Sequence, residues 1–209
     1  MILNIHGFGG EGDNSKYKWL CKNAPCHEIY SPTFNYASEH PYNILEHLLN
    51  RIASYRRKTP DNPMGVYVVG NSLGGFFARR INQIYPSVPA LLINPSLAPF
   101  LSLREYLSDS QCQDYLDLLA RYAYDDDSGN REYLHVIIGD SDEVINHEIL
   151  TKPLLPRRFK NLHSIAGGTH RLDMTPEVEN IFRSVIQTPE GETDGDPRYI
   201  HHCGVKKLP

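Results

Sequence analysis

Cysteine is scarce in this sequence, and long apolar runs are missing. Its 209 residues contain four cysteines and no C-x-x-C pair. The four are Cys21, Cys26, Cys112 and Cys203. A chain of this length can build a core without disulfides, so we predict a reducing compartment, with ordinary thiols at Cys21 and Cys26. No apolar run approaches the roughly 20 residues of a membrane-spanning helix. Because Met1 leads into a strand pattern without a basic leader, we expect a cytoplasmic protein without a membrane span.

An excess of charge of one sign is also lacking. The formal net charge is −4. The basic pairs are spread over different predicted elements, as Arg56-Arg57, Arg79-Arg80 and Arg157-Arg158. A nucleic-acid-binding face needs basic side chains gathered on one surface. We therefore expect a small-molecule substrate and no nucleic-acid partner. The sequence gives no indication of the oligomeric state.

The histidines and acidic residues form no metal-ligand pattern. His40 and His47 are seven positions apart, and three consecutive aspartates at 125–127 read as a solvated turn. His201-His202-Cys203 lies in a tail rich in Gly, Asp, Glu and Pro, which cannot bury a core. A flexible extension over 188–209 is favoured over a metal site there. We expect no metal.

A glycine pattern near the start matches a nucleotide-binding fingerprint but lacks its context. Gly7, Gly9 and Gly12 spell G-x-G-x-x-G after a strand pattern. The residues that follow are polar, whereas the fingerprint opens into a helix packed on the sheet. The acidic residue required at the end of the second strand is absent, because Ile29-Tyr30-Ser31-Pro32 stands there. We expect no cofactor.

Strand and helix patterns alternate along the chain. The predicted strands lie near 1–6, 27–31, 65–70, 89–94, 133–139 and 159–165. The predicted helices lie near 15–23, 42–58, 73–85, 143–150 and 174–187. Such alternation predicts an α/β fold: a mostly parallel six-stranded sheet with right-handed crossovers, strand order 2-1-3-4-5-6 and helices on both faces. We expect one domain over 1–187, followed by the tail.

Gly70-Asn71-Ser72-Leu73-Gly74 is the most informative motif. It follows a buried strand pattern at 66–69 and precedes a helix pattern that ends before Pro86. A serine at a strand-to-helix corner is held in a sharp turn, which the glycines on both sides allow. Its hydroxyl points out from the carboxyl edge of the sheet, at a helix N-terminus that stabilises negative charge. This context favours Ser72 as a nucleophile.

A serine nucleophile needs a base and an acid. Asp142 and His170 each follow a separate later strand pattern, so the chain order is Ser72, Asp142, His170. This is the order of α/β-hydrolases. We expect Asp142 to orient His170 and Asp140 to cap its own turn. The alternatives are a helix N-cap for Asp142 and an ordinary polar loop residue for His170.

The loop after the first strand supplies the remaining part of such a site. We predict that the backbone N–H groups of Phe8 and Leu73 form an oxyanion hole, since fixed main-chain donors stabilise charge as it develops. His6 lies next to this loop. We expect it to fix the loop by hydrogen bonding rather than to transfer protons.

The connection from Asn94 to Glu132 is too long for a plain crossover. Its leucines and tyrosines favour two short helices. Insertions at this point in such folds cover the nucleophile, so we predict a small helical lid at about 97–131; the alternative is padding of the sheet edge. We assign the substrate pocket to His6, Phe100, Tyr106 and Leu107.

Five segments carry a family resemblance, at 5–8, 70–78, 93–100, 141–144 and 167–170. Over residues 1–187 the chain resembles small bacterial α/β-hydrolases, the YqiA/YcfP-like esterases. The resemblance implies a minimal α/β-hydrolase fold without the first two strands, and an intracellular, metal-free esterase. Ser72, Asp142 and His170 match the family's catalytic positions, and Phe8 and Leu73 its oxyanion positions. The polar loop at 9–16 and the tail after Thr188 depart from the family.

Three functions fit these patterns. We expect a serine hydrolase that cleaves a small carboxylic ester or thioester through an acyl-enzyme on Ser72. An acyltransferase with the same three residues is the first alternative, because water access is a property of the pocket. A non-catalytic binding module is the second. The intact residue pattern disfavours that module.

Overall fold

A computed structural model describes residues 1–61, 65–122, 131–156 and 159–186. A six-stranded sheet with strand order β2-β1-β3-β4-β5-β6 forms its centre, and every strand pair is parallel. The strands are β1 (Ile2–Ile5), β2 (Ile29–Tyr30), β3 (Tyr67–Asn71), β4 (Ala90–Ile93), β5 (Leu134–Gly139) and β6 (Leu162–Ile165). The predicted order is confirmed, and the order change between β1 and β3 puts the ends of these two strands side by side.

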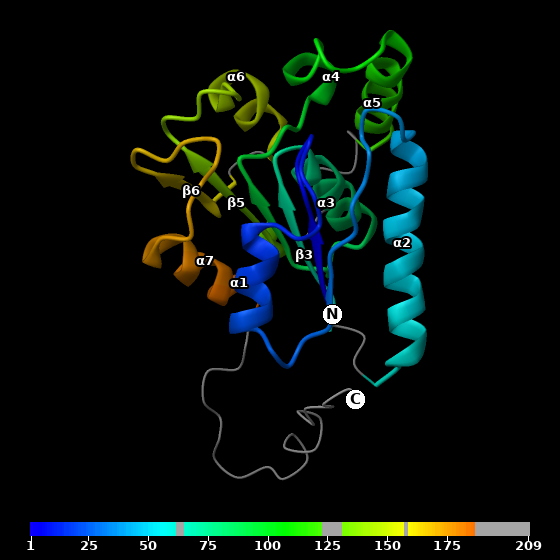
Figure 1. Cartoon of the computed structure of the whole chain (residues 1–209), viewed down its shortest axis with the longest axis vertical. Coiled ribbons are helices and arrows are strands. Elements are labelled where there is room, and N and C mark those ends of the chain that lie inside the picture. Colours follow the sequence, from blue (N-terminus) through cyan, green and yellow to red (C-terminus); the bar gives the residue numbers. More distant parts are fainter. Residues whose placement is uncertain (62–64, 123–130, 157–158, 187–209) are drawn as a thin grey trace.

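Helices cover both faces of the sheet (Figure 1). They are α1 (Ser15–Asn23), α2 (Pro41–Lys58), α3 (Leu73–Ile84), α4 (Pro99–Ser102), α5 (Asp109–Arg121), α6 (His147–Leu150) and α7 (Pro176–Ile186). Two short 3₁₀ turns are η2 (Arg131–Tyr133) and η3 (Lys152–Leu154). The ends of most long helices agree with the sequence prediction to within two residues.

Each face of the sheet has its own apolar core. Side chains alternate along a strand, so Leu3 and Ile5 pack with α2, α3 and α5, while Ile2 packs with α1 and α7. Val68 and Val69 divide in the same way between the two cores. Both faces are covered, which explains why the strands read as continuous apolar runs.

Helix α6 is shorter than the helix predicted at 143–150. The carboxylate of Asp142 accepts hydrogen bonds from the N–H groups of Val144 and Ile145, both at 2.8 Å. These two bonds close a turn over residues 142–145. The chain therefore forms a turn first, and α6 begins only at His147.

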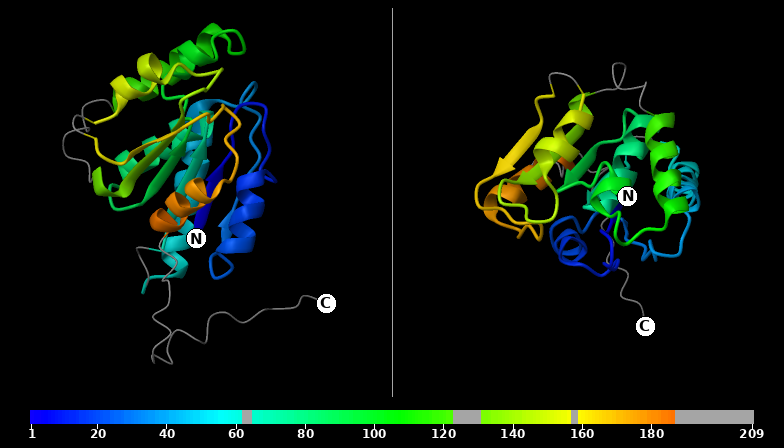
Figure 2. Two further views of the ribbon diagram at one scale, coloured as in Figure 1. Left: turned by 90° about the vertical axis from the view of Figure 1, so that its left-hand side faces the viewer. Right: turned by 90° about the horizontal axis from the view of Figure 1, so that it is seen from above.

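The elements α4, α5 and α6 stand over the carboxyl ends of the strands, as the view from above shows (Figure 2). Helices α4 and α5 lie within the predicted lid at 97–131, of which 123–130 is outside the described residues. The predicted tail at 188–209 is also outside them. In the described part of the chain, no helix combines the length and apolar character needed to cross a bilayer.

Candidate active site

Ser72 stands at the turn between β3 and α3. Its backbone has φ 52° and ψ −118°, and residues other than glycine rarely take such a positive φ. The turn packs too tightly for side chains at the flanking glycines. A Cβ on Gly74 would lie 2.1 Å from the Ile5 carbonyl oxygen, and one on Gly70 would lie 2.4 Å from the Gly74 carbonyl oxygen. The two glycines are therefore required by this geometry, and strained backbone of this kind is typical of functional sites.

His170 lies next to Ser72, and Asp142 lies next to His170, although the three residues are distant in sequence. His170 Nε2 is 3.1 Å from Ser72 Oγ. His170 Nδ1 is 2.9 Å from Asp142 Oδ2 and 3.1 Å from Oδ1. The three residues come from the chain after β3, β5 and β6, at the same edge of the sheet. In this arrangement the ring can donate Nδ1–H to the carboxylate and accept the serine proton at Nε2.

Asp142 is ionised in this environment. Its side chain is 1% exposed, and burial alone raises the pKa of a carboxyl group. Hydrogen bonds from His170 and from the N–H groups of Ile145 and Val144 outweigh burial and lower the pKa of Asp142 below its ordinary value. The carboxylate is therefore only an acceptor, and each group bonded to it must donate a proton.

Two other acidic side chains hold the loop that carries His170. Asp140 Oδ1 accepts the Gly167 N–H at 2.7 Å. Glu143 Oε2 accepts the His170 backbone N–H at 3.0 Å, and this bond lowers the pKa of Glu143. Of the two aspartates after β5, it is thus Asp142 that contacts the imidazole. Asp140 does not cap its own turn as predicted but binds the backbone of the loop after β6.

Two residues that the sequence did not single out complete the surroundings of Asp142. His147 Nε2 is 2.9 Å from Asp142 Oδ2, and its Nδ1 is 2.8 Å from Thr151 Oγ1. Both residues belong to the short segment around α6. No sequence signal marks them, because their contact with Asp142 depends on the turn that precedes the helix.

Asn94 joins three loops at the same edge of the sheet. Its side-chain oxygen accepts the Gly139 N–H at 2.7 Å. Its side-chain nitrogen donates to the carbonyls of Thr169 and His170 at 2.9 and 3.1 Å. The residue is fully buried and has φ 42°, a conformation that asparagine tolerates better than most residues. It holds the loops that carry Asp142 and His170 in register.

The peptide between Gly7 and Phe8 has a fixed orientation. The Gly7 carbonyl oxygen accepts the Gly10 N–H at 3.0 Å and lies 2.7 Å from His6 Nδ1. In a trans peptide the N–H points opposite to the carbonyl, so the Phe8 N–H points away from both of these groups.

Leu73 is the first residue of α3, where a backbone N–H has no acceptor in its own helix. A Cβ on Gly7 would lie 2.9 Å from Ser72 Cβ, so this loop and Ser72 are in contact.

His6 lies beneath this loop rather than in an open pocket. Its Nε2 accepts the Phe34 N–H at 2.9 Å, which leaves Nδ1 to donate to the Gly7 carbonyl. The residue is 2% exposed, and burial lowers the pKa of His6. Both ring nitrogens are therefore engaged with backbone, in agreement with loop fixation and unlike the pocket role assigned from sequence.

The three predicted pocket residues of the lid segment occupy different environments. The Tyr106 ring lies 5.6 Å from that of Phe8 and is 63% exposed. Phe100 is partly buried against the core. Leu107 is 5% exposed and belongs to the core, as do Tyr115 and Leu118 of α5. The segment therefore packs α5 against the sheet helices and leaves Tyr106 at the strand ends.

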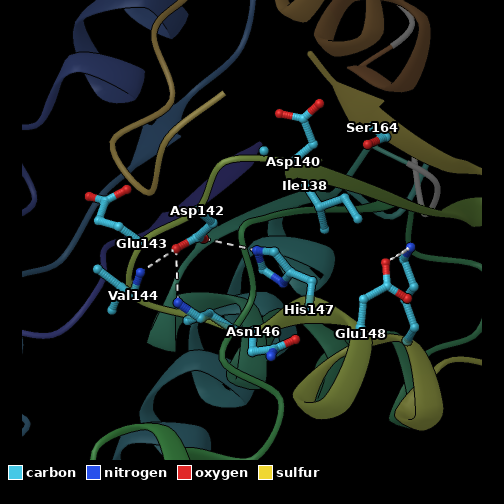
Figure 3. A pocket seen from close by; sticks show the side chains of 12 residues that line it. Ile138, Asp140, Asp142, Glu143, Val144, Asn146, His147, Glu148 and Ser164 are labelled. Atoms are coloured by element: carbon cyan, nitrogen blue, oxygen red, sulfur yellow. Dashed lines mark hydrogen bonds and ion pairs between the residues drawn. The ribbon is translucent and has the colours of Figure 1, made fainter. Parts of the chain in front are cut away.

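A pocket of about 430 Å³ lies beside Asp142 (Figure 3). Its lining includes Asp142 and His147, drawn with their hydrogen bond, but not Ser72 or His170. Carboxylates of Asp140, Glu143 and Glu148 also line it. Within the described residues, no three His, Cys, Asp or Glu side chains are grouped as metal ligands.

Solved structures with a similar fold are α/β-hydrolases. The chain aligns with Est1E from Butyrivibrio proteoclasticus, solved with ferulic acid, at a TM-score of 0.64 and 14% identity, covering 89% of this chain and 88% of that one. It aligns with a putative hydrolase from Agrobacterium vitis S4 at 0.62 and 16% identity, covering 88% and 87%. A monoacylglycerol lipase from Paleococcus ferrophilus gives 0.59 and 14% identity, covering 89% and 92%. At these identities the comparison shows the fold, which is that of an α/β-hydrolase.

Sequence comparison identifies the family. A UPF0227 protein from Shewanella woodyi is 25% identical over 156 residues, which cover 74% of this chain and 82% of that protein. The model of the uncharacterised protein family UPF0227 matches residues 1–173, a span that contains the chain segments of Ser72, Asp142 and His170. The chain therefore belongs to the UPF0227 family.

Proposed function

We propose that this protein is a serine hydrolase that cleaves small carboxylic esters through an acyl-enzyme on Ser72. The observation that carries the proposal is the hydrogen-bonded series Ser72, His170 and Asp142, with its 3.1 Å and 2.9 Å contacts. The α/β-hydrolase fold supports it, because in this fold the nucleophile stands at the turn where Ser72 stands. Two structural neighbours, a monoacylglycerol lipase from Paleococcus ferrophilus and a marine microorganism esterase, agree with ester substrates.

The first half of the reaction forms the acyl-enzyme. Ser72 Oγ attacks the carbonyl carbon of the ester while His170 Nε2 takes the hydroxyl proton. The negative charge of Asp142 stabilises the imidazolium that results. His170 then gives the proton to the departing alkoxide, which leaves as the alcohol. In the second half, water attacks the acyl carbon while His170 Nε2 takes a proton from that water. His170 then returns this proton to Ser72 Oγ as the bond between the acyl carbon and Oγ breaks, which releases the carboxylic acid and free Ser72.

The N–H groups of Phe8 and Leu73 would bind the carbonyl oxygen as it becomes negative. Loss of one donor of this kind costs about 3 kcal/mol of transition-state stabilisation. The Gly7–Phe8 peptide is held by His6 and Gly10, so its N–H direction is set before the substrate arrives. His6 thereby contributes by holding a donor and not by moving a proton.

The acyl group would lie against Phe8 and Tyr106. Their rings are in contact at the strand ends, and Tyr106 is largely exposed, which leaves space for a short acyl chain. Each buried methylene adds roughly 0.8 kcal/mol to binding until the pocket is full. We expect acetyl to hexanoyl esters to be cleaved, with a decline for longer chains.

Hydrolysis of p-nitrophenyl esters from acetyl to decanoyl tests the proposal. Ser72→Ala should lower kcat/KM by about 10⁴-fold or more, as loss of a nucleophile does in other serine hydrolases. Ser184→Ala is the matched control, because Ser184 lies on α7 and bonds only the Ile181 carbonyl among the described contacts. A Ser72→Ala protein that folds and keeps the wild-type rate would refute the proposal. Adding an alcohol as acceptor distinguishes the two reactions, because hydrolysis forms the carboxylic acid and acyl transfer forms a new ester.

A further inference from the structure

The Asp142 carboxylate contacts a second histidine besides His170. His147 Nε2 is 2.9 Å from Asp142 Oδ2, and the two side chains are only 5% and 1% exposed. On the opposite side of the ring, Nδ1 is 2.8 Å from Thr151 Oγ1. His147 and Thr151 are one helical turn apart, so the short helix α6 positions both.

The hydrogen-bond partners determine where the protons of His147 lie. Asp142 can only accept, so Nε2 must carry a hydrogen. Burial lowers the pKa of His147 and favours the neutral ring, in which Nδ1 accepts the hydroxyl proton of Thr151. The same hydroxyl is 3.0 Å from the Pro95 carbonyl oxygen. That acceptor takes the proton when His147 is an imidazolium or is replaced.

We propose that His147 is a positioning residue for the general base and acts through Asp142. This inference rests on the proposed function, since it gives His147 a part in the same reaction. The Nε2–H of His147 fixes Oδ2, while the N–H groups of Val144 and Ile145 fix Oδ1. Both carboxylate oxygens are thereby held, and the orientation that Asp142 offers to His170 is set.

The same bond controls how strongly Asp142 interacts with His170. The carboxylate shares its negative charge between two imidazole donors, and the share that reaches His170 stabilises its imidazolium form. If His147 no longer donates, more of this charge acts on His170 and favours its imidazolium form. Besides Asp142 and His170, the charged groups near His147 include Lys152 on η3 and Glu148 on α6, which are bonded to each other. The carboxylates of Asp140 and Glu143 line the same pocket.

The pocket beside Asp142 gives His147 its own contact with the outside. His147 and Asp142 line this pocket, whereas Ser72 and His170 do not (Figure 3). A proton can therefore reach His147 without passing the acyl group on Ser72. Protonation at low pH would add a positive charge next to Asp142 and weaken its support of His170.

Two substitutions separate donation from the other properties of the ring. His147→Phe keeps a planar ring but cannot donate to Asp142. His147→Gln keeps an N–H at the position of Nε2 and cannot become charged. In both variants Thr151 retains the Pro95 carbonyl as acceptor. His163→Gln on β6 is the matched control, because it removes a half-buried histidine whose ring stacks on His135 and not on the site.

The readout is the midpoint of the acid limb of kcat/KM against pH, measured with a p-nitrophenyl ester. His147→Phe should move the midpoint upward by about half a pH unit, since one donor to a carboxylate contributes roughly that much. His147→Gln and His163→Gln should leave it in place. A residue that only stabilised the fold would lower the melting temperature without moving the midpoint.

The outcomes distinguish this inference from the proposed function. If turnover does not depend on Ser72, both are refuted. If turnover depends on Ser72 and the midpoint of folded His147→Phe equals that of the wild type, only the role of His147 is refuted. Should His147→Phe not fold, His147→Leu also cannot donate to Asp142 and should move the midpoint in the same direction. An unchanged midpoint there would also overturn the inference.

Discussion

Replacing Asp142 with asparagine should reduce turnover far more than the same change at Asp140. In the native site one oxygen of Asp142 accepts two backbone N–H groups and the other faces the rings of His170 and His147. An asparagine can satisfy the backbone donors only by turning its NH₂ group toward the two rings. His170 must then accept at Nδ1 and carry its proton at Nε2, where it faces Ser72 Oγ. A protonated Nε2 cannot take the serine proton.

The change of His170 tautomer determines how much turnover Asp142→Asn should lose. In serine proteases with a Ser-His-Asp triad, the same substitution lowers kcat by about 10⁴-fold, which corresponds to about 5.5 kcal/mol. At Asp140 the oxygen that accepts the Gly167 N–H is retained in asparagine, so we expect a change of no more than a few-fold. Rates of p-nitrophenyl ester hydrolysis, with circular dichroism to verify folding, measure both variants. If Asp140→Asn were the more damaging change in folded protein, the assignment of the acid would be wrong.

Three further predictions concern stability and substrate size. Asn94→Ala should lower the free energy of unfolding by about 2–4 kcal/mol, because it leaves the buried Gly139 N–H without its acceptor and puts alanine at φ 42°. Denaturant titration measures this change, and a loss of stability below about 1 kcal/mol would contradict the prediction. Stability should also fall as the pH drops below about 6.5, since burial lowers the pKa of several histidines and the unfolded chain then binds more protons than the folded one. These residues are His6, His27, His135, His147 and His163. Guanidinium titrations near pH 7.5 and near pH 5.5 at one ionic strength test this, and equal or higher stability at the lower pH would refute it. Tyr106→Ala should shift the preferred ester chain length with little loss of stability. Leu107→Ala, at a buried position, should cost about 2–4 kcal/mol of stability. If Tyr106→Ala left the chain-length preference unchanged and Leu107→Ala shifted it, the acyl group would lie elsewhere.

The fold and the three central residues follow from local sequence patterns. Ser72 comes directly after β3, while Asp142 and His170 lie in the loops after β5 and β6, and parallel strands bring their carboxyl ends to one edge. The strand order could be predicted because alternating elements leave few topologies open. Position relative to a strand is thus enough to find these residues, without knowledge of any side-chain contact.

The supporting residues could not be predicted in the same way. His147 meets Asp142 because a turn, closed by the Asp142 carboxylate, separates this residue from the start of α6 at His147. Asn94 matters through contacts with two loops that are distant in sequence. His6 was assigned to the pocket by its proximity to the loop, but the Phe34 N–H, from the chain after β2, occupies its second nitrogen. Such contacts depend on loop conformation, which periodicity does not encode.

The covalent reactivity of Ser72 is the most direct test of the account. The purified protein is treated with a fluorophosphonate, which forms a stable adduct with an activated serine, and the modified peptide is located by mass spectrometry. We predict one adduct at Ser72, formed slowly when His170 is replaced by alanine and absent in Ser72→Ala. An adduct at another serine, or no adduct in protein that hydrolyses esters, would contradict an acyl-enzyme on Ser72.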